Sequence, residues 1–206
     1  MVEALTNLDY QSPPIVLDVG ASDGITSHHI IQSIDYDKYF ITDLNTEILY
    51  EIRDGKCYFY DKDNSCILIV TKLFVIYSDV KGSIFPFNKL AGYFFSKPLK
   101  AHKSLKMIEL INPAVKTIVD NILITQYDIF KEWPNEKVDL IIAANILNNC
   151  YFPEKQIKLA IMILINALND GGRFVIVDSR DIEKGTIFQV LNKGIKAEKD
   201  INGGTE

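Results

Sequence analysis

The stretch Val16–Gly24, with the sequence VLDVGASDG, decides the fold class that we expect for this chain. Its first residues are apolar and predict the end of a buried strand, and its glycines predict a tight turn into a helix. Small residues occupy the turn at Gly20, Ala21, Ser22 and Gly24. Small side chains let the backbone approach a ligand closely, so the stretch indicates a nucleotide-type cofactor at a strand–loop–helix unit.

A carboxylate stands where the ribose of such a cofactor needs one. The next apolar run, Lys38–Thr42, predicts a second strand, and Asp43 ends it about 20 residues past the loop. The loop does not have the G-x-G-x-x-G spacing that a dinucleotide pyrophosphate requires. Asp18 and Asp23 would also repel a pyrophosphate, whereas they would attract the sulfonium and ammonium groups of S-adenosylmethionine.

The segment Asp18–Gly24 resembles the first motif of class I S-adenosylmethionine-dependent methyltransferases, acidic-x-Gly-x-Gly-x-Gly, with Ser22 in place of the middle glycine. Four more segments resemble motifs of that family in the same order. They are the ribose-binding acid at Asp43, the adenine-binding segment Gln126–Ile129, the fourth strand Val138–Asn145 and the turn Leu168–Ile176 into the fifth strand. The resemblance implies a set of cofactor-binding residues: Asp18, Gly20, Ala21, Ser22, Gly24, Asp43, Leu44, Asp128, Ile129 and Asn145.

Apolar runs alternate with helical patterns along the chain, which predicts an α/β fold. The resemblance implies a Rossmann-like, doubly wound, mostly parallel sheet of the seven-stranded type with helices on both faces. We expect strands at Ile15–Val19, Lys38–Thr42, Ile122–Tyr127, Val138–Ala143 and Arg173–Asp178, and a final hairpin of Thr186–Leu191 and Ile195–Lys199. We expect a helix after an N-cap at Thr26 or Ser27, and another over Glu154–Asn169 that is ended by Gly171-Gly172. A third helix is expected over Leu99–Val119, interrupted or restarted at Asn112-Pro113.

We expect one methyltransferase-like domain over residues 1–206, with an insertion over residues 45–98 after the second strand. Within it, Lys56–Tyr60 and Ile67–Ile76 alternate like the strands of a hairpin. Residues 83–106 mix aromatic side chains with lysines. A packed insertion with a solvated lysine face is the first interpretation of this mixture. The functional alternatives are a lid over the substrate, a docking surface for a protein partner, or contact with an anionic lipid surface, which the negative net charge disfavours.

The composition limits the function classes. Lys and Arg number 22 and Asp and Glu 27, for a net charge of −5, which argues against general nucleic-acid binding. A hydrophobic content of 48% excludes a disordered chain. Three cysteines are too few for a disulfide framework, no apolar run reaches the roughly 18 residues of a membrane span, and no signal peptide is recognisable. These observations predict a soluble, cytoplasmic protein.

No metal site is expected. His28 and His29 are adjacent, so their side chains point about 100° apart on a helix, and no acidic or cysteine cluster assists them. The segment Asp61–Ser65 begins like a calcium loop. Cys66 stands where such a loop needs glycine, and Lys72 where it needs glutamate.

The predicted reaction is methyl transfer to a small molecule or a protein side chain. It needs alignment and exclusion of water more than a strong base, because the cofactor already carries a good leaving group. Asn148, Asn149 and Tyr151 follow the fourth strand and are expected to face the substrate pocket, but the catalytic residue is unknown. The alternative is a non-catalytic, methyltransferase-like binding or scaffold subunit.

Overall fold

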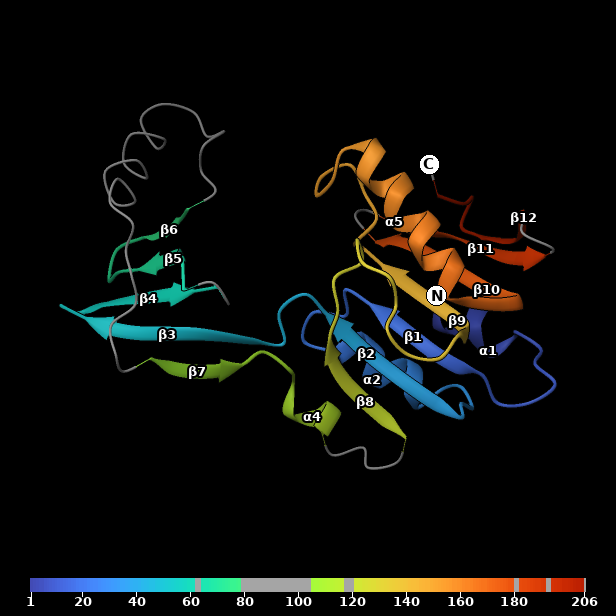
Figure 1. Cartoon of the computed structure of the whole chain (residues 1–206), viewed down its shortest axis with the longest axis horizontal. Helices are drawn as coiled ribbons and strands as arrows, with labels where there is room; N and C mark the ends of the chain where they lie inside the picture. The colour runs from blue at the N-terminus through green and yellow to red at the C-terminus, as the bar shows by residue number, and fades with distance from the viewer. Residues whose placement is uncertain (62–63, 79–104, 117–120, 180–181, 192–193, 206) are drawn as a thin grey trace. The chain divides into compact units, whose positions relative to one another are not determined.

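A computed structural model describes residues 1–61, 64–78, 105–116, 121–179, 182–191 and 194–205 (Figure 1). The chain divides into two compact units. Unit 1 comprises Met1–Thr46 and Ile111–Glu206, and unit 2 comprises Glu47–Leu110. We describe each unit by itself.

Unit 1 contains a seven-stranded sheet. In order from one edge, its strands are β8 (Ile122–Gln126), β2 (Lys38–Asp43), β1 (Ile15–Val19), β9 (Val138–Ala144), β10 (Leu168–Ser179), β11 (Glu183–Leu191) and β12 (Gly194–Ile201). The strands from β8 to β10 are parallel, whereas β11 is antiparallel to both of its neighbours. This is the mostly parallel α/β sheet, Rossmann-like in strand order, that the sequence predicts.

Helices cover both faces of this sheet. Side chains alternate between the two faces along each strand, and apolar side chains on each face pack against helices. Val16 packs with the helices α1 (Val2–Thr6), α2 (Ile25–Ile31) and α4 (Pro113–Lys116). Its neighbour Leu17 lies in a second cluster, with the helix α5 (Glu154–Ala167). Both side chains are fully buried, so β1 is a central strand with a core on each side.

Two helix boundaries differ from the prediction. The helix α2 begins at Ile25 with Gly24 as its N-cap, so neither Thr26 nor Ser27 caps it. The helix α5 ends at Ala167, before the predicted Asn169. The reason is that Leu168, 2% exposed, already pairs with Val138 in the sheet, and its burial ends the helix early.

The predicted helix over Leu99–Val119 is wrong at residues 106–109, whereas its predicted restart at Asn112-Pro113 is confirmed. Lys106–Glu109 forms the strand β7, and only Pro113–Lys116 is helical, as α4. The strand forms because β7 pairs antiparallel with β3 (Glu47–Arg53), a partner distant in sequence. The helix α4 begins where Asn112 caps it, since the side-chain Oδ1 of Asn112 accepts the backbone N–H of Ala114 at 3.0 Å.

Unit 2 contains a five-stranded antiparallel sheet. Its order is β6 (Val75–Tyr77), β5 (Cys66–Val70), β4 (Lys56–Tyr60), β3 and β7. The predicted hairpin is present as β4 and β5, although its second strand divides into β5 and β6. That residues 45–98 are an insertion into a single domain remains a prediction. The predicted lid or docking surface, residues 83–106, lies outside the described residues up to residue 104.

Candidate functional site

The site lies where the strand order of the unit 1 sheet changes direction. From β1 the chain continues to β2 and β8 on one side, and to β9 and β10 on the other. Open α/β sheets bind ligands at the carboxyl ends of the strands beside such a switch point. Apart from Asp18, which lies within β1, the residues that the sequence assigns to the cofactor lie at or after the carboxyl ends of β1, β2, β8 and β9. The parallel pairing therefore brings four predicted segments to one edge.

The glycine loop after β1 has the backbone conformation that its sequence predicts. Gly20 and Gly24 have φ angles of +66° and +79°, and Ser22 has a φ of +56°. A hydrogen bond of 2.9 Å from the backbone N–H of Ala21 to the carbonyl of Thr42 ties the loop to β2. The left-handed conformation explains the glycines at positions 20 and 24, because side chains there would be strained.

Asp43 faces this loop from the end of β2. The backbone N–H of Ser22 donates to its Oδ2 atom at 2.9 Å, and the backbone N–H of Asn45 donates to its Oδ1 atom at 3.0 Å. A carboxylate has about four acceptor positions, so two remain after these bonds. The half-buried carboxylate is therefore fixed in orientation and can still accept hydrogen bonds from a ligand.

Asp128 lies beside Asp43, since the backbone N–H of Tyr127 donates to the Asp43 carbonyl at 2.9 Å. Its own Oδ1 atom accepts the backbone N–H of Phe130 at 3.0 Å. Ile129 is only 6% exposed and packs in the core with α5, so it anchors the segment Gln126–Ile129 to the core. Leu44 is 47% exposed and offers an apolar side chain beside the two carboxylates.

Asp18 is placed differently from Asp43. Its carboxylate is 3% exposed, and its Oδ2 atom accepts hydrogen bonds from the Ser27 hydroxyl at 2.7 Å and the Tyr39 hydroxyl at 3.0 Å. Burial raises the pKa of Asp18 to about 6, against the opposing effect of the two hydroxyl donors. Asp18 therefore links β1 to α2 and β2 internally, and its carboxylate does not face the ligand edge.

Asn145 joins the end of β9 to the end of β10. Its φ angle is +61°, its backbone N–H donates to the Val177 carbonyl at 2.7 Å, and its Oδ1 atom accepts the Ser179 N–H at 2.6 Å. The next residue, Ile146, packs against the glycine loop. A Cβ atom added at Gly20 would lie too close to the Cδ1 atom of Ile146, so this side chain would have to move, and the φ angle of +66° also favours glycine.

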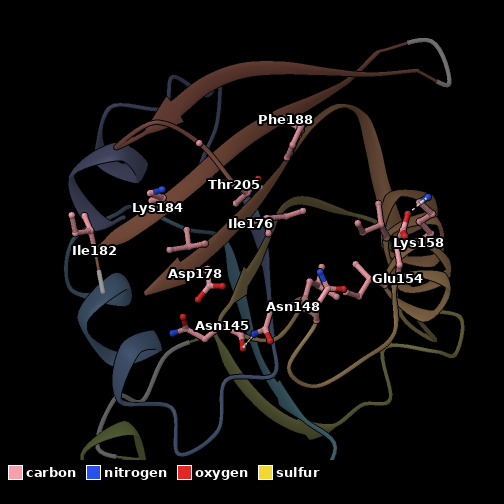
Figure 2. A pocket seen from close by; sticks show the side chains of 16 residues that line it. Asn145, Asn148, Glu154, Lys158, Ile176, Asp178, Ile182, Lys184, Phe188 and Thr205 are labelled. Atoms are coloured by element: carbon pink, nitrogen blue, oxygen red, sulfur yellow. Dashed lines mark hydrogen bonds and ion pairs between the residues drawn. The ribbon is translucent and has the colours of Figure 1, made fainter. Parts of the chain in front are cut away.

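A cavity of about 730 Å³ lies beside Asn145, which is one of its lining residues (Figure 2). Its walls come from the loop after β9, the first half of α5, the strands β10 and β11, and residues 204–205. The lining residues are Asn145, Leu147, Asn148, Asn149, Glu154, Ile157, Lys158, Ile161, Ile176, Val177, Asp178, Ile182, Lys184, Phe188, Gly204 and Thr205. Asn148 and Asn149 line this cavity, whereas Tyr151 does not. That these residues face the substrate pocket remains a prediction.

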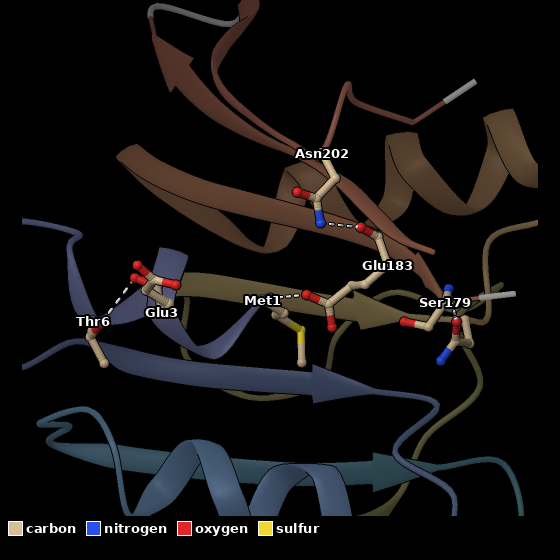
Figure 3. Close-up of polar contacts among 7 residues, drawn as sticks. Met1, Glu3, Thr6, Ser179, Glu183 and Asn202 are labelled. Carbon is tan, nitrogen blue, oxygen red and sulfur yellow. Dashed lines mark hydrogen bonds and ion pairs between the residues drawn. The ribbon is translucent and has the colours of Figure 1, made fainter. Parts of the chain in front are cut away.

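The end of the β10–β11 hairpin is held by polar contacts (Figure 3). The amino group of Met1 forms an ion pair with Glu183, and the side-chain amide of Asn202 donates to the Glu183 carbonyl at 2.7 Å. Together with the Ser179–Asn145 bond, these contacts fix one wall of the cavity. Sequence reasoning predicted the strands that carry Ile176, Asp178 and Phe188 but assigned none of these side chains to a site, because neither the motif nor the strand pattern shows which side chains line a cavity.

No group of three or more His, Cys, Asp or Glu side chains could hold a metal ion within the described part of the chain. No helix among the described residues is long and apolar enough to cross a membrane.

No protein-family model and no curated protein matches this chain. Solved structures of methyltransferases do resemble it. The N-methyltransferase NodS from Bradyrhizobium japonicum WM9, solved with S-adenosyl-L-homocysteine, is 14% identical with a TM-score of 0.42, over 82% of this chain and 55% of that chain. An O-methyltransferase family protein from Burkholderia thailandensis is 10% identical with a TM-score of 0.45, over 86% of this chain and 36% of that chain.

A third structure is CalO1, a methyltransferase in calicheamicin biosynthesis, solved with S-adenosyl-L-homocysteine bound. It is 11% identical with a TM-score of 0.44, over 86% of this chain and 34% of that chain. The matched part of each of these three proteins is between about a third and just over half of its length. The activity of this chain therefore has to be argued from its own residues.

Proposed function

We propose that this chain is an S-adenosylmethionine-dependent methyltransferase acting on a small molecule or a protein side chain. The observation that carries the proposal is the pairing of the glycine loop with Asp43 at the switch point of the sheet. The Ser22 N–H bond to Asp43 fixes a carboxylate beside a loop without bulky side chains. A nucleoside needs this combination of open backbone and a ribose-binding acid.

The residues present fit the cofactor. Asp43 keeps two acceptor positions for the ribose hydroxyls, and Asp128 provides a carboxylate for an exocyclic amine on the neighbouring strand end. The exposed side chain of Leu44 offers an apolar contact for a base. When bound, the cofactor supplies a methyl group activated by a sulfonium.

The remaining work of catalysis falls to the chain. The loop after β9 is fixed by three hydrogen bonds of Asn145, the third from the Asn148 side-chain amide to the Asn145 carbonyl at 2.9 Å. A fixed loop beside the glycine turn can orient an acceptor for in-line attack. Such orientation removes a large part of the activation barrier in reactions of this kind. Apolar walls such as Ile176 and Phe188 would exclude water from the reaction.

Titration calorimetry tests the cofactor assignment. We expect wild-type protein to bind S-adenosylmethionine in preference to NAD, and Asp43→Ala to weaken binding about 10- to 100-fold. This is the scale of one or two charge-assisted hydrogen bonds, about 1.4–2.8 kcal/mol. Glu132→Ala, which removes an exposed carboxylate elsewhere, should leave the affinity unchanged. Preference for NAD, or full affinity in Asp43→Ala, would overturn the proposal.

One observation favours the alternative of a non-catalytic, methyltransferase-like binding or scaffold subunit. The Ile146 side chain occupies the space beside Gly20, so one side of the glycine loop is already covered by protein. Such a subunit would bind S-adenosylmethionine without consuming it. Incubating the protein with labelled cofactor and a mixture of small amine and hydroxyl compounds separates the two functions, since only the enzyme forms S-adenosylhomocysteine.

A further inference from the structure

We propose that the cavity beside Asn145 binds the methyl acceptor, and that the acceptor is a small amphipathic molecule without net charge. This inference rests on the proposed function and narrows its substrate class. It excludes a protein side chain as the natural acceptor.

The location of the cavity supports the acceptor role. Residues 145–149 form one short loop, and its members face two directions. Ile146 packs against Gly20 of the glycine loop, while Asn145, Leu147, Asn148 and Asn149 line the cavity. The cavity therefore begins at residues that flank Ile146, the residue in contact with the predicted cofactor loop, so one loop borders both sites.

The size of the cavity favours a small molecule. A volume of about 730 Å³ lies within the roughly 300–1,000 Å³ of pockets that enclose drug-sized ligands. Walls from four parts of the chain surround it, namely the β9 loop, α5, the β10–β11 hairpin and the segment at Thr205. A site for one side chain of a folded protein would need only part of this volume.

The apolar wall follows from the register of β10 and β11. Residues two apart on a strand share a face, and directly paired residues also share one. Phe174 pairs with Phe188, and both lie in the cluster packed by α5. Ile176 lies two residues further along this face, so Ile176 and Phe188 present a continuous apolar surface to the cavity. Ile157 and Ile161 of α5 face it from the opposite side.

The charged lining groups balance each other. Glu154 and Lys158 form an ion pair on α5, and Asp178 and Lys184 are direct register partners on β10 and β11. Figure 2 shows the two pairs at opposite ends, with Ile176 and Phe188 between them. A ligand with a strong net charge gains no net attraction here, and burying it unpaired would be costly. Asn145, Asn148 and Asn149 supply neutral hydrogen-bonding groups at the loop.

The transfer step is balanced without a further reagent. A lone pair of the acceptor nitrogen or oxygen forms the new bond to the methyl carbon. The carbon–sulfur bond breaks with its electron pair left on sulfur, and the proton of the acceptor leaves to water. The products are a neutral thioether and a methylated acceptor.

Two dyes with the same ring system test the ligand class. N-Phenyl-1-naphthylamine is neutral, and 8-anilino-1-naphthalenesulfonate adds one sulfonate charge. In fluorescence titrations of the full chain, we expect the neutral dye to bind at least five-fold more tightly. Ile157→Trp on α5 and Thr205→Trp on the segment at residues 204–205 fill the cavity from two of its walls, and each should weaken that binding at least ten-fold. Leu159→Trp, on an exposed α5 position that does not line the cavity, should change it less than two-fold.

Several outcomes would overturn the inference. Equal or tighter binding of the anionic dye contradicts the uncharged ligand class. Unchanged affinity in both folded cavity-filling variants, checked by circular dichroism, contradicts the site. Calorimetry with S-adenosylmethionine on the same samples separates the two proposals. If the cofactor binds and the dye results fail, only the acceptor assignment is wrong; if the cofactor does not bind, the proposed function fails and the acceptor role with it.

Discussion

Asp18 and Asp43 show how two aspartates of the glycine-loop region have different tasks. Asp43 is half-buried, and its carboxylate is held by backbone N–H groups with acceptor positions left over. The carboxylate of Asp18 is enclosed by protein and receives two hydroxyl groups. We therefore expect substitutions at Asp43 to change cofactor affinity, and substitutions at Asp18 to change stability and its pH dependence.

The pKa of Asp18 predicts the sign of this dependence. Burial raises it to about 6 from an ordinary value of 3.8, so folding favours the protonated acid. The group then costs stability at neutral pH, and the cost falls as the pH drops from 7 toward 4. We expect the free energy of unfolding of wild type, relative to Asp18→Asn, to rise by about 1 kcal/mol between pH 7 and pH 5.

Urea unfolding of both proteins at the two pH values measures this difference. The Asn variant keeps a carbonyl that can accept from Ser27 or Tyr39 but has no charge to titrate. It therefore serves as the reference for all other groups. A constant difference between the two proteins, or one with the opposite sign, would contradict the burial of a titrating Asp18.

At the scale of elements, two loops depend on one contact. Gly20, in the loop between β1 and α2, lies against the side chain of Ile146, in the loop after β9. We expect Gly20→Ala to lower the free energy of unfolding by about 2–4 kcal/mol, because the methyl collides with Ile146 and the φ of +66° becomes strained.

A double-mutant cycle separates these two causes. Ile146→Ala removes the collision and leaves the strain, so we expect Gly20→Ala to cost about 1–2 kcal/mol less in that background. Thermal or denaturant unfolding of the four proteins measures the coupling. Additive effects of the two substitutions would show that the loops are not in contact.

The elements also show what a sequence can predict. The strands β1, β2 and β9 were predictable because each is an apolar run buried on both faces, and the glycine turn because positive φ angles favour glycine. The closeness of Asp43 and Asp128 was predictable because the carboxyl ends of the parallel strands β2 and β8 lie at the same edge of the sheet. These features depend on local pattern or on topology alone.

Other elements depend on partners that no local pattern reveals. Lys106–Glu109 lies within the segment predicted as a helix, yet it is a strand because β3 pairs with it. The burial of Asp18 depends on hydroxyls of Ser27 and Tyr39, nine and 21 residues away. The cavity draws its lining from several elements, so only its loop side, Asn148 and Asn149, could be anticipated.

The whole molecule is organised as two units, and the chain leaves and re-enters unit 1 near the glycine loop. Asn45 donates to Asp43, which accepts from Ser22, while the backbone N–H of Asn112 donates to the Asp23 carbonyl at 2.8 Å. Both connections to unit 2 therefore start from the same small region of unit 1.

This arrangement predicts that unit 1 folds without unit 2. We expect replacement of residues 47–110 by a short Gly/Ser linker to leave a cooperatively unfolding sheet. S-adenosylmethionine affinity should be within about five-fold of the full chain, since every proposed cofactor residue lies in unit 1. Circular dichroism and calorimetry measure the two properties. A folded variant that has lost the cofactor would place essential contacts in unit 2.

The parallel pairing of β2 with β8 also has a consequence during protein synthesis. The ribosome releases β2 first and must then make all of residues 47–110 before β8 emerges, which takes several seconds at about 5–20 residues per second. During that interval one edge of β2 has unpaired backbone groups that can pair with other nascent chains. We therefore expect slow translation of residues 47–110 to increase aggregation, and chaperones to act on the chain at this stage.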